Sequence, residues 1–429
     1  MSSNNPSEAA GLPARAAALD LIAAALSRRA GLDEGLAHPA LTALESRDRN
    51  FARAVVMAAL RRLGPIDQAL QSRLQKPPPE RVVNILRLAL AQLFVLKTPA
   101  HAAVSSAVDL AQAHKLSRPF KGLVNGVLRG LLRDPPELAD PERLAPQWLF
   151  ARWGAAYGDA SARAIAALIA DEPATDLSFR DPAQAAELAP ALEGEVLPGG
   201  SLRAGLRGDI ASWPAFDDGR WWVQDAAAAI PARLLAVKPA EAVLDLCAAP
   251  GGKTLQLAAA SGQVIALDRS APRLERLKQN LARTGLTAEV VVADAETWRD
   301  DRRFDAVLLD APCSATGTFR RHPDVLWAAR PQDVATLAGV QARLLDCAAD
   351  RVRPGGRLVY CVCSLEPEEG EAQVQALLQR RPDYAIAPAT AGEGGAPSAS
   401  LRPDGTLRIL PHHLAGGLDG FYVARLTRS

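Results

Sequence analysis

The sequence has few of the residues, and none of the segments, that mark secreted or membrane proteins. Its five cysteines are too few for a disulfide framework in 429 residues, and no Cys-x-x-Cys pair or histidine cluster suggests a zinc site. No apolar run approaches the ~20 residues that a membrane-spanning helix needs. The polar segment 1–8 lacks the basic-then-apolar build of a secretory signal. We therefore expect a cytoplasmic protein with reduced thiols, no bound metal and no membrane partner.

The small net charge of the chain conceals an asymmetry. Residues 51–133 hold 13 Lys and Arg against 3 Asp and Glu, a charge of +10, whereas the rest of the chain carries −9. A basic module on an acidic body favours a polyanionic partner, RNA or DNA. Composition alone is equally compatible with a helical module whose arginines are simply solvated.

The N-terminal part of the chain, residues 9–134, is predicted to be an all-helical bundle. Leu and Ile recur at three- and four-residue spacing in an alanine-rich background, and the connections are short. Gly64-Pro65 and Pro77-Pro78-Pro79 are expected to interrupt the helices. The expected helices are Ala14–Arg28, Arg49–Leu63, Glu80–Leu96, Ala102–His114 and Pro119–Leu132. The expected anion contacts cluster around the last of them: Arg118, Lys121, Arg129 and Arg133.

A second, smaller domain is predicted after the boundary at Asp134-Pro135-Pro136. Residues 137–230 are mixed, and we expect a small α+β module. Its elements would be a helix over Ala151–Ile169 and short segments at Asp176–Arg180 and Gly194–Leu197. Trp213, Trp221 and Trp222 lie near its end; aromatic rings can stack on bases, but a domain seam explains most of them better.

The third domain, residues 231–429, alternates strands and helices, which predicts a doubly wound parallel sheet. The expected strands are Ala242–Leu246, Gln263–Leu267, Glu289–Val292, Phe304–Leu309 and Arg357–Val362. The expected helices are Thr254–Ala260, Pro272–Thr284 and Pro331–Val352. Leu407–Leu410 and Phe421–Leu426 are expected to form an antiparallel edge, and residues 389–400 a loose insertion.

Two of the predicted strands end in cysteine. Asp310 to Cys313 follow the strand 304–309, and Cys363 follows the strand 357–362. In open α/β sheets ligands bind beyond the carboxyl ends of the strands, so both thiols should face one crevice. A single cysteine would more often be a small buried hydrophobe, but two at strand ends indicate thiol chemistry on a bound ligand.

The first strand of this sheet runs into a glycine-rich turn that suggests a nucleoside site. A nucleotide-binding P-loop would need glycine where Cys247 stands, and the dinucleotide pattern Gly-x-Gly-x-x-Gly is absent. Asp268 ends the second strand and could accept both ribose hydroxyls, while Asp294 after the third could accept the adenine amino group. Taken singly, each acid could instead cap a turn. An adenosine ligand without a pyrophosphate is predicted, next to Cys247, Ala248, Ala249, Pro250, Gly251, Gly252 and Lys253.

Together these motifs resemble the NOP/Sun family of S-adenosylmethionine-dependent RNA cytosine-5 methyltransferases. The resemblance rests on the stretches 247–253, 310–314 and 363–364, with further support from 320–324, 367–369 and 419–421. The helical domain, with its stretch Leu123–Arg129, resembles the NusB-like domain of the Sun-type branch. That branch methylates small-subunit ribosomal RNA. The fold implied is a NusB-like bundle, a small linking domain and a Rossmann-like methyltransferase domain.

The resemblance also implies residue roles. S-adenosylmethionine would be held by residues 247–253 with Asp268, Asp294 and Asp310. Cys363 would add to carbon-6 of a cytosine in 16S ribosomal RNA, whose carbon-5 is then methylated, and Cys313 would assist release of the product. Asp310 could interact with ring nitrogen-3, and Lys253 or the pair Arg320 and Arg321 could supply positive charge to the thiol. A monomer acting on RNA is expected.

Cys361 departs from the family pattern, which usually has a small or hydroxylated residue two positions before the nucleophile. Strand alternation places Cys361 and Cys363 on the same face, so the number of thiols does not choose between them. We predict Cys363, which lies next to Ser364 at the strand end.

Two other functions are compatible with parts of the sequence. A DNA cytosine-5 methyltransferase would use Cys313, in its Pro-Cys context, as the nucleophile. A non-catalytic RNA-binding factor would keep the helical domain beside a vestigial methyltransferase fold, but the full set of acids and thiols argues against it.

Overall fold

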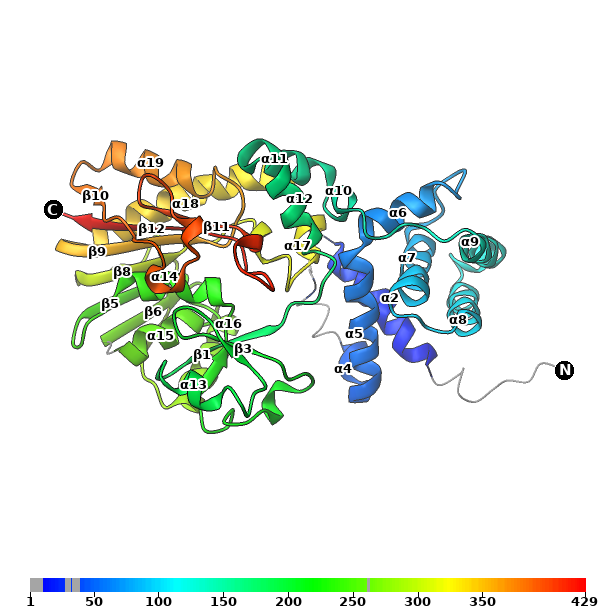
Figure 1. The fold of residues 1–429 in the computed structure, drawn as a ribbon, viewed down its shortest axis with the longest axis horizontal. Coiled ribbons are helices and arrows are strands. Elements are labelled where there is room, and N and C mark those ends of the chain that lie inside the picture. Colours follow the sequence, from blue (N-terminus) through cyan, green and yellow to red (C-terminus); the bar gives the residue numbers. More distant parts are fainter. Residues whose placement is uncertain (1–10, 28–31, 33–38, 261–262) are drawn as a thin grey trace. The chain divides into compact units, whose positions relative to one another are not determined.

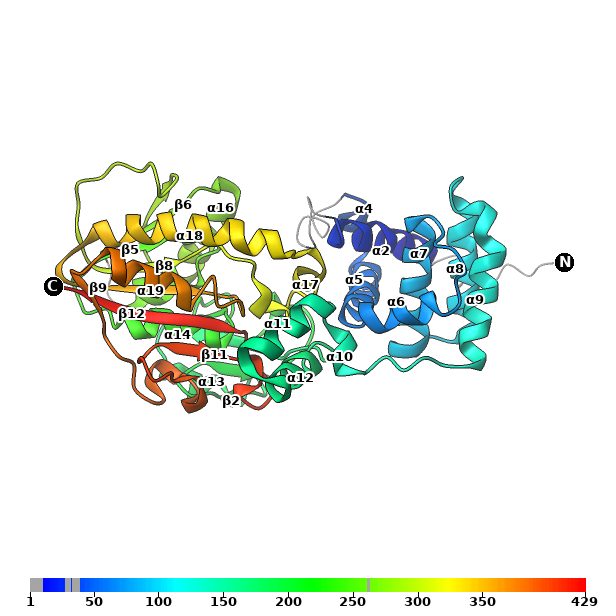
Figure 2. The same ribbon diagram turned by 90° about the horizontal axis from the view of Figure 1, so that it is seen from above.

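The computed structural model describes residues 11–27, 32, 39–260 and 263–429 (Figures 1 and 2). They form two compact units. Unit 1 comprises Met1–Glu172 with Phe319–Ala328, and unit 2 comprises Pro173–Thr318 with Ala329–Ser429. The described helices include none that is both long and apolar enough to cross a membrane.

Unit 1 is all-helical, and most of its helices surround one apolar core. In α7 (Glu80–Leu90), for example, Val82, Ile85, Leu86 and Ala89 recur at helical spacing and are buried. The remaining helices are α2 (Leu12–Ala25), α4 (Pro39–Thr42), α5 (Ser46–Arg61), α6 (Leu63–Gln71), η1 (Ala91–Val95), α8 (Ala100–Ala113), η2 (Arg118–Phe120), α9 (Lys121–Arg133), α10 (Pro141–Leu144), α11 (Gln147–Tyr157), α12 (Asp159–Ala167) and α17 (Asp324–Ala328).

One expected helix in this unit is wrong, and one expected helix end lies close to the observed one. The helix expected to stop at Gly64-Pro65 ends at Arg61, but Gly64-Pro65 itself lies in the first turn of the next helix, α6, where proline is tolerated because its missing N–H has no partner to lose. The single helix expected over Ala151–Ile169 is two helices, α11 and α12, which are separated by Gly158 at φ 84°. The C-terminal end of the first expected helix, Arg28, lies outside the described residues.

A short segment from far along the chain completes unit 1. The ring of Phe319 lies 6.0 Å from that of Trp153, and Trp327 Nε1 donates to the Leu60 carbonyl over 3.1 Å. The carbonyl of Arg320 accepts from Arg61 Nη2 at 2.6 Å. Arg320 is only 2% exposed, so the expectation that it faces RNA is not supported.

Unit 2 begins with a small antiparallel sheet in the order β2-β3-β1-β4. Its strands are β1 (Thr175–Phe179), β2 (Glu195–Val196), β3 (Leu202–Ala204) and β4 (Trp221–Val223), with the helix α13 (Gln184–Leu188) and the 3-10 turn η3 (Ile210–Ser212) beside them. Trp213 and Trp221 are buried in its core, and Trp222 is buried against Ala266 and Leu277 further along the chain, so none of the three offers a base a free face. The division into three domains stays a prediction.

The large sheet has eight strands in the order β10-β12-β9-β8-β5-β6-β7, with β11 paired to β12. Five strands are parallel: β5 (Ala242–Leu246), β6 (Gln263–Asp268), β7 (Glu289–Val292), β8 (Phe304–Asp310) and β9 (Val352–Val362). The antiparallel strands are β10 (Tyr384–Ile386), β11 (Leu407–Ile409) and β12 (Phe421–Arg428). The doubly wound Rossmann-like fold is confirmed.

Helices cover both faces of this sheet, which explains why its strands are continuous apolar runs. On one face Val307 and Tyr360 pack against α18 (Pro331–Arg351) and α19 (Glu371–Arg380). On the other face Leu308 and Val359 pack against α14 (Ala226–Leu235) and α15 (Gly252–Ala260). Figure 2 shows α18 and α14 on opposite sides of β9 and β12. The helix α16 (Ala271–Thr284) packs against Trp222 and Ala266.

The expected loose insertion at residues 389–400 is wrong. Ala389 and Ala396 are buried against α14, and the segment contains the 3-10 turns η5 (Glu393–Gly395) and η6 (Ser398–Ser400). Its small residues permit this close packing, which composition alone cannot distinguish from a linker. The pairing of β11 with β12 is confirmed, but β12 is an inner strand because β9 flanks it on the other side.

Candidate active site

The parallel strands β5, β6, β8 and β9 present their carboxyl ends at one edge of the large sheet, and the expected site residues follow them. The turn after β5 begins with Cys247 at φ 61° and reaches α15 at Gly252. Gly251 has φ 109°, and a Cβ there would lie 2.3 Å from Leu277 Cδ1. A glycine is therefore required for this turn to pack closely on α16.

Asp268 ends β6 and reaches back to the turn after β5. Its side chain is 4% exposed, and its two oxygens accept from the backbone N–H groups of Ala249 at 3.1 Å and Ser270 at 2.8 Å. Two such bonds leave further lone pairs on the carboxylate. Asp268 also lines a pocket, together with Cys247, Asp294 and Pro312. A buried acceptor with spare capacity in a pocket suits ribose hydroxyls.

Asp294 is brought to the same pocket, but it also caps a turn. It follows β7 and is exposed, and its Oδ1 accepts from the backbone N–H of Glu296 at 2.9 Å. Asp294 could therefore both cap this turn and bind a ligand in the pocket. Ala248 and Ala249 do not line this pocket, and their side chains are buried against α16.

Asp245 lies beneath this turn and is completely buried. Its Oδ2 accepts from the Thr254 hydroxyl at 2.6 Å, and its Oδ1 has no hydrogen-bond partner among the described residues. Burial raises the pKa of Asp245 to about 7, although the Thr254 hydrogen bond opposes the shift. The carboxyl group is therefore poised to change charge near neutral pH.

A partly buried ion pair lies at the end of β8. Lys253 Nζ donates to Asp310 Oδ2 over 2.8 Å, and Cys361 Sγ donates to Asp310 Oδ1 over 3.4 Å. Burial is the largest single influence and lowers the pKa of Lys253, but the charge and hydrogen bond of Asp310, together with the nearby Cys361 and Cys363, raise that pKa above its ordinary value. Lys253 therefore stays an ammonium group. Its Nζ also lies 5.1 Å from the ring of Phe421, a contact that sequence analysis missed.

The two cysteines expected to react are neighbours in space. Cys313 Sγ lies 3.5 Å from Cys363 Sγ, although 50 residues separate them in sequence. The hydrogen bond with Cys363, followed by burial, raises the pKa of Cys313 well above its ordinary value. Cys313 is thus a neutral thiol that can donate to the sulfur of Cys363.

The other thiols near the site are poorly suited to ionise. Burial raises the pKa of Cys247 to about 12, and nearby carboxylates reinforce the effect. Burial and then the Asp310 charge raise the pKa of Cys361 well above its ordinary value. Cys361 is also buried and bonded to Asp310, whereas Cys363 is partly exposed and lies beside Cys313, a difference that strand alternation could not show.

Sequence analysis also missed a carboxylate beneath the thiol pair. Glu369 is fully buried, and its oxygens accept from Ser314 and Ser364, the residues that follow the two cysteines. The stretch that contains it was noted only as part of the family resemblance. Ser314 and Ser364, which follow the two cysteines in the sequence, were the signal that could have pointed to a buried acceptor.

Comparisons with known proteins agree with this geometry. Residues 232–427 match the family model described as 16S rRNA methyltransferase RsmB/F, and residues 12–133 match the NusB family. A protein of Sodalis glossinidius called ribosomal RNA small subunit methyltransferase B is 38% identical, over 92% of this chain and 95% of its own length.

Solved structures share the fold. The crystal structure of PH0851 has a TM-score of 0.77 at 24% identity and covers 96% of this chain and 99% of its own. The NSun6 protein from Pyrococcus horikoshii, solved with SFG, an analogue of S-adenosylmethionine, has a TM-score of 0.57 at 20% identity over 66% of this chain and 98% of its own. With its NusB-like helical unit and its Rossmann-like sheet, the chain belongs to the RsmB/F family of 16S rRNA methyltransferases, which depend on S-adenosylmethionine.

Proposed function

We propose that this protein methylates carbon-5 of a cytosine in 16S ribosomal RNA through a covalent adduct between Cys363 and carbon-6 of the base. The observation that carries the proposal is the pair of thiols, 3.5 Å apart at the ends of adjacent parallel strands, beside the Lys253–Asp310 ion pair. Family membership supports the class of substrate.

The residues at the strand ends fit S-adenosylmethionine. Asp268 would accept the ribose hydroxyls, Asp294 would accept from the adenine amino group, and the turn 247–253 would leave room for the ligand. When bound, the cofactor supplies an electrophilic methyl group on a sulfonium sulfur.

Cys363 is assigned as the nucleophile. Its thiolate forms the bond to carbon-6, the carbon-5–carbon-6 double bond opens, and ring nitrogen-3 gains a proton, so carbon-5 becomes enamine-like. The Lys253 ammonium and the Asp310 carboxyl group, 2.8 Å apart, are the groups we assign to the nitrogen-3 side of the base. Lys253 also contributes the positive charge that a thiolate needs nearby.

Cys313 is assigned to product release. After methylation a base takes the proton from carbon-5, and the electron pair left behind restores the double bond between carbon-5 and carbon-6. The bond between sulfur and carbon-6 breaks, Cys363 departs as a thiolate, and nitrogen-3 gives up the proton that it gained. A neutral thiol 3.5 Å away can donate to this departing sulfur, which favours elimination. Loss of Cys313 should therefore stall the reaction at the methylated adduct.

Adduct trapping on denaturing gels tests these roles. With a 16S rRNA fragment and S-adenosylmethionine, Cys313→Ala should give a slow-migrating protein–RNA band, while Cys363→Ala and the double variant should give none. Cys347→Ala, in α18 away from the strand ends, is the matched control and should behave like the wild-type protein. A band that requires Cys313 and survives loss of Cys363, with duplex DNA as the better substrate, would favour the DNA-type mechanism instead.

A further inference from the structure

We propose that Glu369 is a positioning residue that clamps the two cysteine-bearing loops together, and that the release step depends on it more than the addition step does. The proposal rests on the covalent function proposed above. It concerns a side chain that touches neither sulfur but holds the residue next to each of them.

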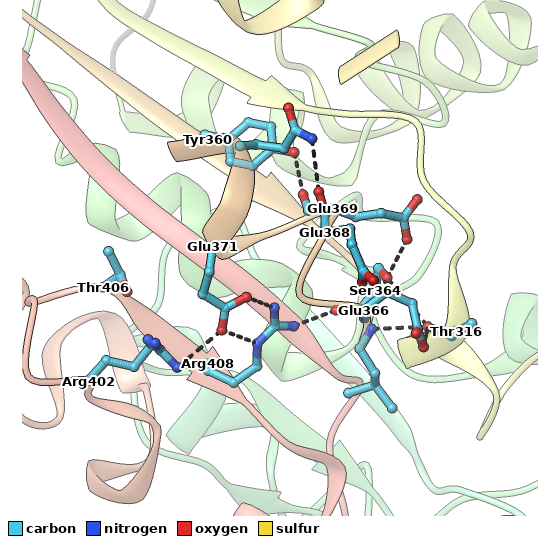
Figure 3. A network of polar contacts seen from close by, with 12 residues as sticks. Thr316, Tyr360, Ser364, Glu366, Glu368, Glu369, Glu371, Arg402, Thr406 and Arg408 are labelled. Atoms are coloured by element: carbon cyan, nitrogen blue, oxygen red, sulfur yellow. Dashed lines mark hydrogen bonds and ion pairs between the residues drawn. The ribbon is translucent and has the colours of Figure 1, made fainter. Parts of the chain in front are cut away.

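Glu369 is held firmly in the turn between β9 and α19. It is 0% exposed, and its backbone carbonyl accepts from the Tyr360 hydroxyl at 2.5 Å (Figure 3). Its backbone N–H donates to the Glu366 carbonyl at 3.1 Å. The carboxylate thus starts from a fixed backbone and cannot swing to solvent.

The carboxylate accepts four hydrogen bonds. Oε1 accepts from the backbone N–H of Ser314 at 2.9 Å and from Gln341 Nε2 at 3.1 Å. Oε2 accepts from the hydroxyls of Ser314 and Ser364, each at 2.5 Å. Four donors match the lone-pair capacity of an ionised carboxylate. They come from the loop after β8, the end of β9 and helix α18.

The buried carboxylate contributes to the geometry of the two loops rather than to the stability of the fold. In the described part of the chain Glu369 has no salt-bridge partner, and a buried carboxylate without a cation is usually more costly than a well-packed apolar side chain. Its donors are the residues directly after Cys313 and Cys363. The carboxylate therefore helps to fix the spacing of the two loops, together with the bond from the Gly317 N–H to the Cys363 carbonyl at 3.0 Å and the contact between the Ser314 and Ser364 hydroxyls at 3.1 Å.

The two loops do not depend equally on the clamp. The Cys363 side has other anchors, because the Ser364 carbonyl accepts from Arg408 Nη1 at 2.6 Å and the Ser364 hydroxyl accepts from the Glu366 N–H at 3.0 Å. Arg408 is itself held by Glu371 (Figure 3). Ser314, by contrast, directs both its backbone N–H and its hydroxyl to Glu369. Loss of the carboxylate should therefore displace Cys313 more than Cys363.

The test compares Glu369→Ala and Glu369→Gln with Glu368→Gln, a neighbouring exposed carboxylate, in the full-length protein. We expect Glu369→Ala to lower kcat about a hundredfold, the scale of a small misplacement of reacting groups. The KM for RNA and the affinity for S-adenosylmethionine should stay near wild-type values. The fraction trapped as adduct should rise towards that of Cys313→Ala, and Glu369→Gln, which keeps the shape and one acceptor, should recover part of the kcat.

Each outcome decides the proposal. An unchanged kcat in both variants overturns it, as does a fall in kcat with less adduct than in the wild-type protein. If Glu369→Ala fails to fold, the kcat and the adduct fraction of Glu369→Gln give the answer. The Cys313→Ala variant is run in parallel: if it traps no adduct, the proposed function fails, whereas a trapped adduct with wild-type behaviour of both Glu369 variants refutes only the clamp.

Discussion

Among single residues, Asp245 has the clearest expected effect on the pH dependence of stability. Its pKa of about 7 in the folded protein lies above that of an unfolded aspartate, so between about pH 4 and 7 the folded state holds a proton that the unfolded chain has released. Stability therefore falls as pH rises through this window. The side chain of Asp245→Asn cannot ionise, so the variant does not lose stability in this way. Its free energy of unfolding relative to the wild-type protein should therefore rise between pH 5 and pH 8, by about 1.4 kcal/mol for each unit by which the fold raises the pKa of Asp245.

Thermal or urea unfolding at four pH values would measure this difference. The groups that face Asp245 are Thr254, Lys253, Asp268 and Asp310, so they must be unchanged in the variant. A stability difference that is constant from pH 5 to pH 8 would contradict the assignment of the shift to Asp245.

Asp268 is the residue for which a loss of cofactor affinity is expected. Asp268→Ala removes an acceptor for the ribose hydroxyls and should weaken S-adenosylmethionine binding by about 1.5–3 kcal/mol, measured by calorimetry. The matched control is Asp305→Ala, because Asp305 also accepts a backbone N–H, that of Ala242, at the opposite end of the sheet. Equal affinity in both folded variants would remove Asp268 from the cofactor site.

Single residues also show where sequence analysis reaches its limit. The positions of Cys313, Cys363 and Asp268 could be predicted because each lies at or just after the end of an apolar strand, and topology gathers strand ends at one edge. The partners of Glu369 could not, because its burial and the direction of the serine hydroxyls depend on how three loops fold onto one another.

At the scale of elements, one glycine keeps the strand-end loops in contact. A Cβ on Gly317 would lie 2.1 Å from the Gly420 carbonyl oxygen and 2.9 Å from that of Cys363. Gly317→Ala should therefore push the β8 loop away from β9 and β12 and reduce kcat strongly. Gly339→Ala, in the interior of α18 where only Arg343 Nη1 lies within 4.0 Å, should keep full activity and add about 0.5–1 kcal/mol of stability.

Methyl transfer to RNA and urea unfolding would be measured for both glycine variants. Activity in Gly317→Ala equal to that in Gly339→Ala would show that the loops tolerate separation, which would also weaken the case for the thiol pair.

The elements differed in how well the sequence specified them. Buried parallel strands are short apolar runs bounded by turn residues, so β5 and β7 were predicted with the observed limits. Helices α11 and α12 were merged because Gly158 is a weak signal within an alanine-rich stretch. The helix α19 and the strand β10 were not predicted at all, because both are short and their packing against α18 and β12 decides their structure.

At the scale of the whole molecule, the basic helix α9 and the residues just before it are expected to bind RNA phosphates. Arg118, Lys121, Arg129 and Arg133 are all exposed. Replacing the four with glutamine should raise the KM for RNA and flatten the salt dependence of binding by about 0.7 for each phosphate that the variant no longer neutralises. Cofactor affinity should not change, since that site lies in unit 2.

The control replaces four exposed basic residues elsewhere in unit 1, Arg47, Lys76, Lys97 and Arg163, with glutamine. Substitution is preferable to deleting the helical domain, because a deletion would strip the buried side chains of residues 319–328 of their partners. The same salt slope in both quadruple variants would indicate that α9 binds a protein rather than RNA.

The late segment that completes unit 1 also sets an order for its folding during synthesis. Phe319 and Leu326 are fully buried, yet they are made 147 and 154 residues after the rest of the unit ends at Glu172. At ordinary elongation rates the ribosome needs roughly 8 to 30 s to cover that distance. A nascent chain therefore carries a helical unit with an open apolar site, which closes only after four of the eight strands of the large sheet, β5 to β8, have been made.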